Sequence, residues 1–121
     1  MKTALNVALA CACFFSSSIA AFAHARLKSA LPPVGGIVAS ATEIRLTFSE
    51  GVEPKFSGIT LTSDSGAAEP LGASALDPGD NKVLIVKIAA PLPPGLYKVT
   101  WHAVSVDTHR TQGDFSFSVK P

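Results

Sequence analysis

A carboxylate and two histidines are the residues of this chain whose types and spacing could bind a metal ion. Asp107 and His109 stand two positions apart in a polar segment, residues 104–113, which we expect to be a loop. In extended backbone, side chains at positions i and i+2 leave the same face, so the carboxylate and the imidazole can converge on one point. Alone, the pair is equally typical of a carboxylate hydrogen-bonded to an imidazole without metal. A metal site therefore needs a third ligand from elsewhere in the sequence.

His24 can provide that ligand if it is the first residue of the mature protein. The 23 residues before it contain Lys2, an apolar run over residues 4–15, and small residues that end in Ala21-Phe22-Ala23. This layout is typical of a cleaved secretory signal peptide. The alternative is an uncleaved membrane anchor, because residues 4–23 are nearly long enough to span a bilayer. The polar residues within them and the A-x-A ending favour cleavage after Ala23, which leaves residues 24–121 as the mature domain.

A terminal histidine has two nitrogens that can bind one metal ion, the free α-amine and Nδ1, and together they close a six-membered chelate ring. The α-amine has an ordinary pKa of about 8, so a metal displaces its proton at modest cost near neutral pH. With His109 added, the set has three nitrogens, and Asp107 offers a carboxylate. Nitrogen and oxygen ligands in a tetragonal arrangement suit Cu(II), whereas Zn(II) prefers tetrahedral closure.

The composition of the mature chain restricts its partners. Cys11, Cys13 and Met1, the only sulfur-containing residues, all lie in the leader, so neither a disulfide nor a thiolate or thioether site for Cu(I) is available. Lys2 is the only one of the 10 Lys and Arg residues in the leader, which leaves nine basic beside nine acidic side chains. This balance gives no reason to expect nucleic acid or an anionic membrane surface as a partner.

Short alternating strands are expected to position these residues. Apolar residues recur at every second position, and turn signals such as Asp77-Pro78-Gly79 and Pro93-Pro94-Gly95 separate the runs. The expected strands are residues 26–31, 42–48, 58–62, 66–75 (weak), 82–88, 96–103 and 114–119. The alternation points inward at Ile44, Leu46, Phe48, Tyr97, Val99, Trp101, Phe115, Phe117 and Val119, and it points His102 outward. We predict one all-β domain, a seven-stranded Greek-key sandwich or barrel of immunoglobulin-like or cupredoxin-like type.

With these residues in view, the mature chain resembles the CopC family of periplasmic copper-resistance proteins. The likeness rests on the combination of His24-Ala25, residues 29–33, residues 46–50, residues 92–97, and the closing segment from Trp101 to Val119. It implies a Greek-key β-fold and copper carriage or buffering in the periplasm. It also implies His24 as the terminal ligand and Asp107 with His109 as the late-loop pair. Glu50 stands where some members place a further carboxylate ligand, and it ranks below the other three residues.

Two departures from the family pattern matter. The family loop usually reads Asp-Gly-His, but Thr108 occupies the middle position here and disfavours the left-handed backbone that glycine allows. We therefore expect a slightly different loop shape that keeps the convergence of Asp107 and His109. The methionine-rich Cu(I) segment of some relatives is also missing, which agrees with the composition.

The leading hypothesis is a periplasmic Cu(II)-binding protein, not an enzyme, that sequesters copper or passes it to a membrane transporter. The resemblance suggests an inner-membrane transporter of the CopD type as recipient. We expect a monomer, although alternating strands leave sheet edges that could pair. One alternative is a copper monooxygenase that uses an N-terminal histidine, as lytic polysaccharide monooxygenases do. The other is an immunoglobulin-like interaction domain without metal.

Overall fold

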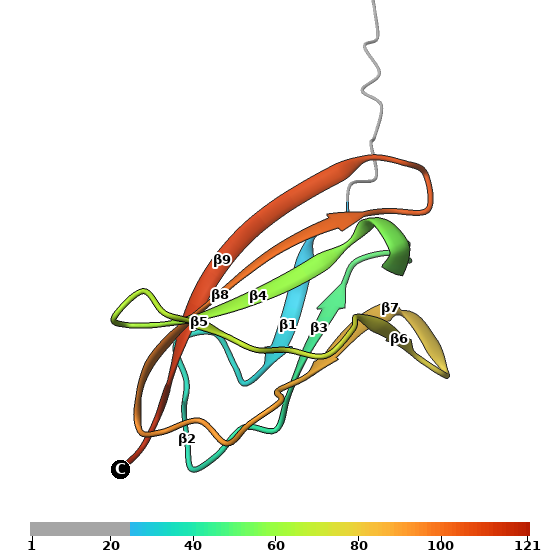
Figure 1. Ribbon diagram of the computed structural model, residues 1–121. Coiled ribbons are helices and arrows are strands. Elements are labelled where there is room, and N and C mark those ends of the chain that lie inside the picture. Colours follow the sequence, from blue (N-terminus) through green and yellow to red (C-terminus); the bar gives the residue numbers. More distant parts are fainter. Residues whose placement is uncertain (1–24) are drawn as a thin grey trace, which may run out of the picture.

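Two β-sheets stack face to face in the computed structural model, which describes residues 25–121 (Figure 1). The described chain contains strands and a single 3-10 turn. In chain order these are β1 (Leu27–Leu31), β2 (Ile37–Val38), β3 (Glu43–Phe48), η1 (Pro54–Phe56), β4 (Gly58–Ser63), β5 (Ala68–Glu69), β6 (Ala75–Asp77), β7 (Asp80–Lys87), β8 (Gly95–Val104) and β9 (Arg110–Val119). None of the helical structure within residues 25–121 is long and apolar enough to cross a membrane.

The two sheets draw their strands from alternating parts of the sequence. One has four strands in the order β1-β3-β7-β6, and the other has five in the order β2-β9-β8-β4-β5. All pairings are antiparallel except that of β2 with β9, which is parallel. The predicted all-β Greek-key sandwich is confirmed. Its seven longer strands match the expected number, and the two-residue strands β2 and β5 are added at the edges of the larger sheet.

Alternation in the sequence places one face of each strand in the core. On β3, Ile44, Leu46 and Phe48 are at most 1% exposed, while the residues between them are half-buried. The inward positions predicted on β8 and β9 are also buried, and Val99 and Phe117 are almost fully enclosed. Because side chains alternate with a period of two, this register removes every large apolar side chain of one face from water.

Aromatic contacts lie both between the two sheets and within the larger sheet. Phe48 on β3 packs edge-on against Trp101 on β8, with ring centroids 5.2 Å apart and planes at 68°. Tyr97 and Phe117 stack side by side within the larger sheet, with centroids 5.7 Å apart. Edge-to-face and offset geometries suit the ring quadrupoles, so these pairs add to the stabilisation from buried area.

The last strand differs from the expectation in its start. β9 begins at Arg110, not at residue 114, so β8 and β9 form a long hairpin with a tight loop. Two positions of the inward phase, Thr111 and Gly113, carry no apolar side chain and therefore gave no hydrophobic signal. Gly113 has a packing reason, because a Cβ there would lie 2.8 Å from Cζ2 of Trp101. The indole of Trp101 thus occupies the space that a side chain at position 113 would need.

The weak strand expected over residues 66–75 is not one strand. Its first part forms β5, which pairs with β4, and its end begins β6, which pairs with β7 in the other sheet. Pro70 and Gly72 lie between the two parts, and the chain crosses from one sheet to the other there. A proline cannot donate to a strand ladder and a glycine weakens one, so the crossing falls at these residues.

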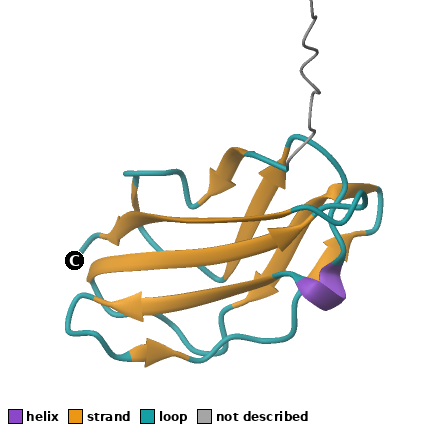
Figure 2. Ribbon diagram, turned by 90° about the horizontal axis from the view of Figure 1, so that it is seen from above, coloured by secondary structure: helices purple, strands orange, loops and turns teal. Residues whose placement is uncertain are grey.

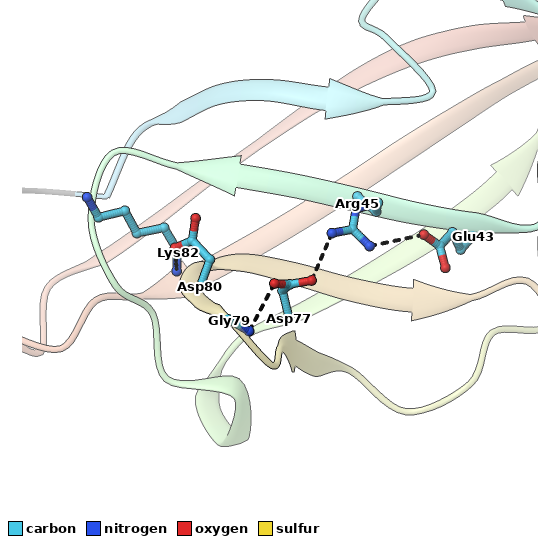
Figure 3. Close-up of polar contacts among 6 residues, drawn as sticks. All are labelled: Glu43, Arg45, Asp77, Gly79, Asp80 and Lys82. Atoms are coloured by element: carbon cyan, nitrogen blue, oxygen red, sulfur yellow. Dashed lines mark hydrogen bonds and ion pairs between the residues drawn. The ribbon is translucent and has the colours of Figure 1, made fainter.

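An ion-pair cluster on the smaller sheet holds the β6–β7 hairpin to β3 (Figure 3). The Arg45 guanidinium lies 3.0 Å from Oδ1 of Asp77 and 3.3 Å from Oε2 of Glu43. Asp77 also accepts a hydrogen bond from the backbone N–H of Gly79 in the hairpin turn. The Arg45 hydrogen bond lowers the pKa of Asp77 below its ordinary value, and the Gly79 N–H acts in the same direction.

Candidate metal centre

The loop that joins β8 to β9 is five residues long and is closed by its own backbone. The N–H of Ser105 donates to the carbonyl of His109 at 2.9 Å, and the N–H of Thr108 donates to the carbonyl of Ser105 at 2.8 Å. Thr108 adopts the left-handed backbone, with φ of 74°. The expectation that Thr108 would keep the loop out of this conformation is therefore wrong. The loop takes the turn that glycine would favour, at a conformational cost of about 1–2 kcal/mol.

Asp107 and His109 converge as the spacing predicted, although the backbone between them turns instead of extending. Nδ1 of His109 lies 3.2 Å from Oδ1 of Asp107, and the backbone N–H of His109 donates to the same oxygen at 3.2 Å. The hydroxyl of Ser105 donates to this oxygen as well. The two ionisable side chains are 37% and 46% exposed, so both can be reached from solvent.

These contacts determine the chemistry of the pair. The pKa of Asp107 is lower than its ordinary value, chiefly because the Ser105 hydroxyl donates to the carboxylate, with further lowering by the N–H groups of His109 and opposition from partial burial. In a neutral imidazole, the N–H at Nδ1 points to the carboxylate, and the lone pair therefore resides on Nε2. A carboxylate that holds one ring nitrogen in this way fixes the ring orientation and leaves the other nitrogen available to a metal.

The start of the described chain is fastened beside this loop. Ala25 is fully buried, and its carbonyl accepts a hydrogen bond from Oγ1 of Thr111 at 2.8 Å. Arg26 and Ser49 exchange two hydrogen bonds of 2.8 Å, one of them through the hydroxyl of Ser49. His24 itself lies outside the described residues. Its neighbour Ala25, however, is held by a residue only two positions after His109.

The segment that contains Glu50 lies against the same loop. The N–H of Val106 donates to the carbonyl of Gly51 at 3.0 Å, and Val52 forms an isolated bridge with Ser105. Figure 2 shows this end of the sandwich, marked by η1, opposite the end that carries the C-terminus. Glu50 is half-buried here. Within residues 25–121, no three His, Asp or Glu side chains gather closely enough to hold a metal ion.

His102 lies on the outer face of the larger sheet, as the alternation predicted. It is half-buried on β8 above Gly58, where a Cβ would lie 2.8 Å from its Cε1. His102 also lines a shallow hollow of about 350 Å³ together with Thr60, Gln112 and Asp114. This hollow does not include Asp107 or His109, so His102 is not part of the candidate centre.

Comparison with known proteins identifies the family of this fold and loop. The model of the CopC domain matches residues 27–120. The chain belongs to the CopC domain family. It is 38% identical over 109 residues to copper resistance protein C of Escherichia coli, covering 85% of this chain and 86% of that protein. It is 43% identical over 100 residues to protein YobA of Escherichia coli strain K12, covering 82% and 81%.

A solved structure agrees with this assignment. The CopC domain described here superposes on the crystal structure of PcoC, a methionine-rich copper resistance protein from Escherichia coli, with a TM-score of 0.75 and 39% identity. The match covers 81% of this chain and 100% of PcoC. The resemblance inferred from the sequence is confirmed.

Two side chains of the CopC domain at or beside the candidate centre were not anticipated, namely Ser105 and Thr111. Ser105 bonds to Asp107 and Thr111 bonds to Ala25. Each is a small hydroxyl residue in a strand-rich region, and serine or threonine there does not by itself indicate a role at a binding site. The proximity of Ser105 to Asp107 in sequence was a usable signal, because serine hydroxyls commonly bond to groups two residues away.

Proposed function

We propose that this CopC domain is a periplasmic Cu(II)-binding protein, with His24, Asp107 and His109 as ligands and Glu50 as an additional carboxylate ligand. The hydrogen bond between Thr111 and Ala25 carries the proposal, because it anchors the residue next to His24 beside the loop that presents His109. The names of the relatives support copper as the metal. The signal peptide over residues 1–23 and cleavage after Ala23 are part of the proposal, since cleavage creates the α-amine ligand.

The donor set suits the proposed ion. His24 would provide its α-amine and Nδ1, and His109 would provide Nε2, which the bond from Nδ1 to Asp107 leaves with its lone pair. Three nitrogens with carboxylate oxygens match the tetragonal preference of Cu(II). The sequence has no Cys or Met beyond residue 13, and so it lacks the soft ligands that Cu(I) requires. PcoC, by contrast, is described as methionine-rich.

Binding without catalysis is the role that we favour. The only Trp and the only Tyr of the chain, Trp101 and Tyr97, are 7% and 3% exposed. They therefore contribute nothing to a flat aromatic surface of the kind that a polysaccharide monooxygenase needs. The anchoring of Ala25 beside the late loop favours a metal centre over an interaction domain without metal. Copper would be sequestered, buffered or delivered by a monomer, with a CopD-type inner-membrane transporter as the proposed recipient.

The proposal is tested by Cu(II) titration followed by electron paramagnetic resonance on two forms of the protein. One begins at His24 and the other carries a single extra Gly before it. We expect a three-nitrogen signal only in the form that begins at His24, because the extra residue converts the α-amine into an amide. Equal binding with the same spectrum in both forms would show that the terminal chelate is wrong.

Acidification provides a second check on the ligand set. Protons compete for the α-amine and for both imidazoles, so lowering the pH should release the copper. Equilibrium dialysis of the copper-loaded protein between pH 7 and pH 3 measures this release. Retention of full affinity well below pH 4 would contradict nitrogen ligation.

A further inference from the structure

Ser105 is a buried hydroxyl residue that the proposed ligand set does not use. It is fully enclosed where β8 passes into the loop, and it is one of only two buried polar residues within residues 25–121. Burying a hydroxyl costs free energy unless it makes a hydrogen bond. An alanine would allow the same backbone pairing at this position, so backbone pairing does not explain why a hydroxyl is buried here.

The partners of the Ser105 hydroxyl provide that explanation. Oγ donates to Oδ1 of Asp107 and also lies 3.2 Å from the carbonyl of His109. A hydroxyl has one proton, and the charged carboxylate is both the nearer and the stronger acceptor. All three hydrogen-bond contacts of the Asp107 side chain within residues 25–121 go to Oδ1, from Ser105 Oγ and from the two N–H groups of His109. Oδ2 is therefore the oxygen left for a metal.

We propose that Ser105 is a positioning residue of the metal centre: its buried hydroxyl holds the Asp107 carboxylate in the orientation that fixes the His109 ring and directs Oδ2 outward. The inference rests on the proposed function. Ser105 lies inside the fold and does not touch the ion. It acts through Asp107, whose side chain is more than a third exposed and would otherwise rotate in solvent.

The other buried serine is a matched control. Ser57 is 8% exposed, and its hydroxyl accepts a hydrogen bond from the N–H of Val104 at 3.0 Å, at the residue just before Ser105. Ser57→Ala removes a buried hydrogen bond at the same end of the sandwich without touching Asp107. It should lower the stability of the fold while the copper spectrum stays as in the wild type.

The test compares Ser105→Ala, Ser105→Thr and Ser57→Ala, each beginning at His24, by Cu(II) competition titration and electron paramagnetic resonance. Loss of a partner that orients a ligand typically weakens metal binding by about 10–100-fold. We expect Ser105→Ala to weaken Cu(II) binding by about tenfold and to change the g and hyperfine values. Ser105→Thr, which keeps the hydroxyl, should restore both. Equal effects in Ser105→Ala and Ser57→Ala would overturn the proposal, because Ser105 would then act only on the fold.

A double-mutant cycle with Asp107→Ala makes the test independent of the threonine variant. If Ser105 acts through Asp107, then Ser105→Ala should have no further effect on copper affinity once Asp107 is alanine. Additive losses would refute the positioning role. A wild type that binds no Cu(II) would overturn the proposed function as well. A wild type with the terminal-histidine signal and a Ser105→Ala variant with the same signal would overturn this inference alone.

Discussion

The hydrogen bond from Thr111 to Ala25 can be removed with little change of shape by Thr111→Val. Valine keeps the branched side chain and lacks the hydroxyl that donates to the carbonyl of Ala25 at 2.8 Å. Ala25 is fully buried, so its carbonyl would lose a donor where water cannot readily replace it. The substitution therefore tests whether this bond both stabilises the fold and positions Ala25, the neighbour of the proposed ligand His24.

The expected magnitude follows from the burial of the acceptor. A typical intramolecular hydrogen bond contributes about 0.5–1.5 kcal/mol net, and a buried group left without a partner costs about 1–3 kcal/mol. Thr111 is half-buried, and valine places a methyl group where the hydroxyl was, which offsets part of the loss. We expect the free energy of unfolding to fall by about 1 kcal/mol. For a domain of this size that corresponds to a Tm lower by about 4–8 °C.

Copper affinity should fall in parallel if the bond positions His24. A factor of ten in affinity corresponds to about 1.4 kcal/mol, so loss of the anchor weakens Cu(II) binding by up to about tenfold. Thermal unfolding followed by circular dichroism measures the first effect, and competition with a chromophoric chelator measures the second. Thr100→Val is the matched control, because Thr100 lies exposed on the neighbouring strand β8.

Two outcomes would refute this reasoning. If Thr111→Val and Thr100→Val have the same Tm, the buried carbonyl of Ala25 does not depend on Thr111. If Thr111→Val lowers the Tm but leaves copper affinity unchanged, the anchor stabilises the sandwich without positioning His24.

Three further predictions address the loop, the core and the ion-pair cluster. Because φ is 74° at position 108, the Thr108→Gly variant should be more stable to urea than Thr108→Ala by about 1 kcal/mol, the reverse of the order at ordinary loop positions. A Thr108→Ala variant at least as stable as Thr108→Gly would contradict the left-handed turn. Gly113→Ala should cost about 1–3 kcal/mol in the same assay, because its Cβ would lie 2.8 Å from Trp101. Gly72→Ala is the control, since its Cβ would be 3.7 Å from the nearest atom and should leave stability nearly unchanged. The pKa of Asp77 is lowered in the fold, so its ion pair stabilises the protein above the ordinary pKa of 3.8, and that stabilisation is lost as the pH falls through the lower folded value. Unfolding of Asp77→Asn and the wild type at pH 7 and pH 2 should therefore show a difference that shrinks at pH 2, and a difference independent of pH would exclude the ion pair as its cause.

Most of the sandwich could be predicted because apolar residues at every second position are the ones that a half-buried strand places in the core. The strands with strict alternation, such as the one from Glu43 to Phe48, were predicted within one residue at each end. The start of β9 was not predicted because its inward positions carry Thr111 and Gly113. Thr111 faces inward to donate a hydrogen bond to Ala25, and Gly113 leaves room for the Trp101 ring. Hydrophobicity alone cannot reveal either reason.

The candidate site, like the fold, could be predicted only in part from the sequence. The spacing of Asp107 and His109 was sufficient to predict their convergence, because two residues so close in sequence have few ways to separate. The left-handed turn at Thr108 was not predicted, because the intrinsic preference of threonine opposes it. The contacts of Ser105 and the hydrogen bonds that close the loop supply the compensating stabilisation.

The sequence by itself determined the class of the fold, the inward faces of its strong strands, the donor types available to a metal and the absence of sulfur ligands beyond residue 13. These are local properties, set by the period of the apolar residues and by the chemistry of single side chains. Only the tertiary structure decided that Ala25, at the start of the described residues, lies beside the late loop. The hydrogen bond that fastens it joins Ala25 to Thr111, which are 86 positions apart. Such a contact exists only once both sheets have packed, because packing brings the start of β1 next to the start of β9.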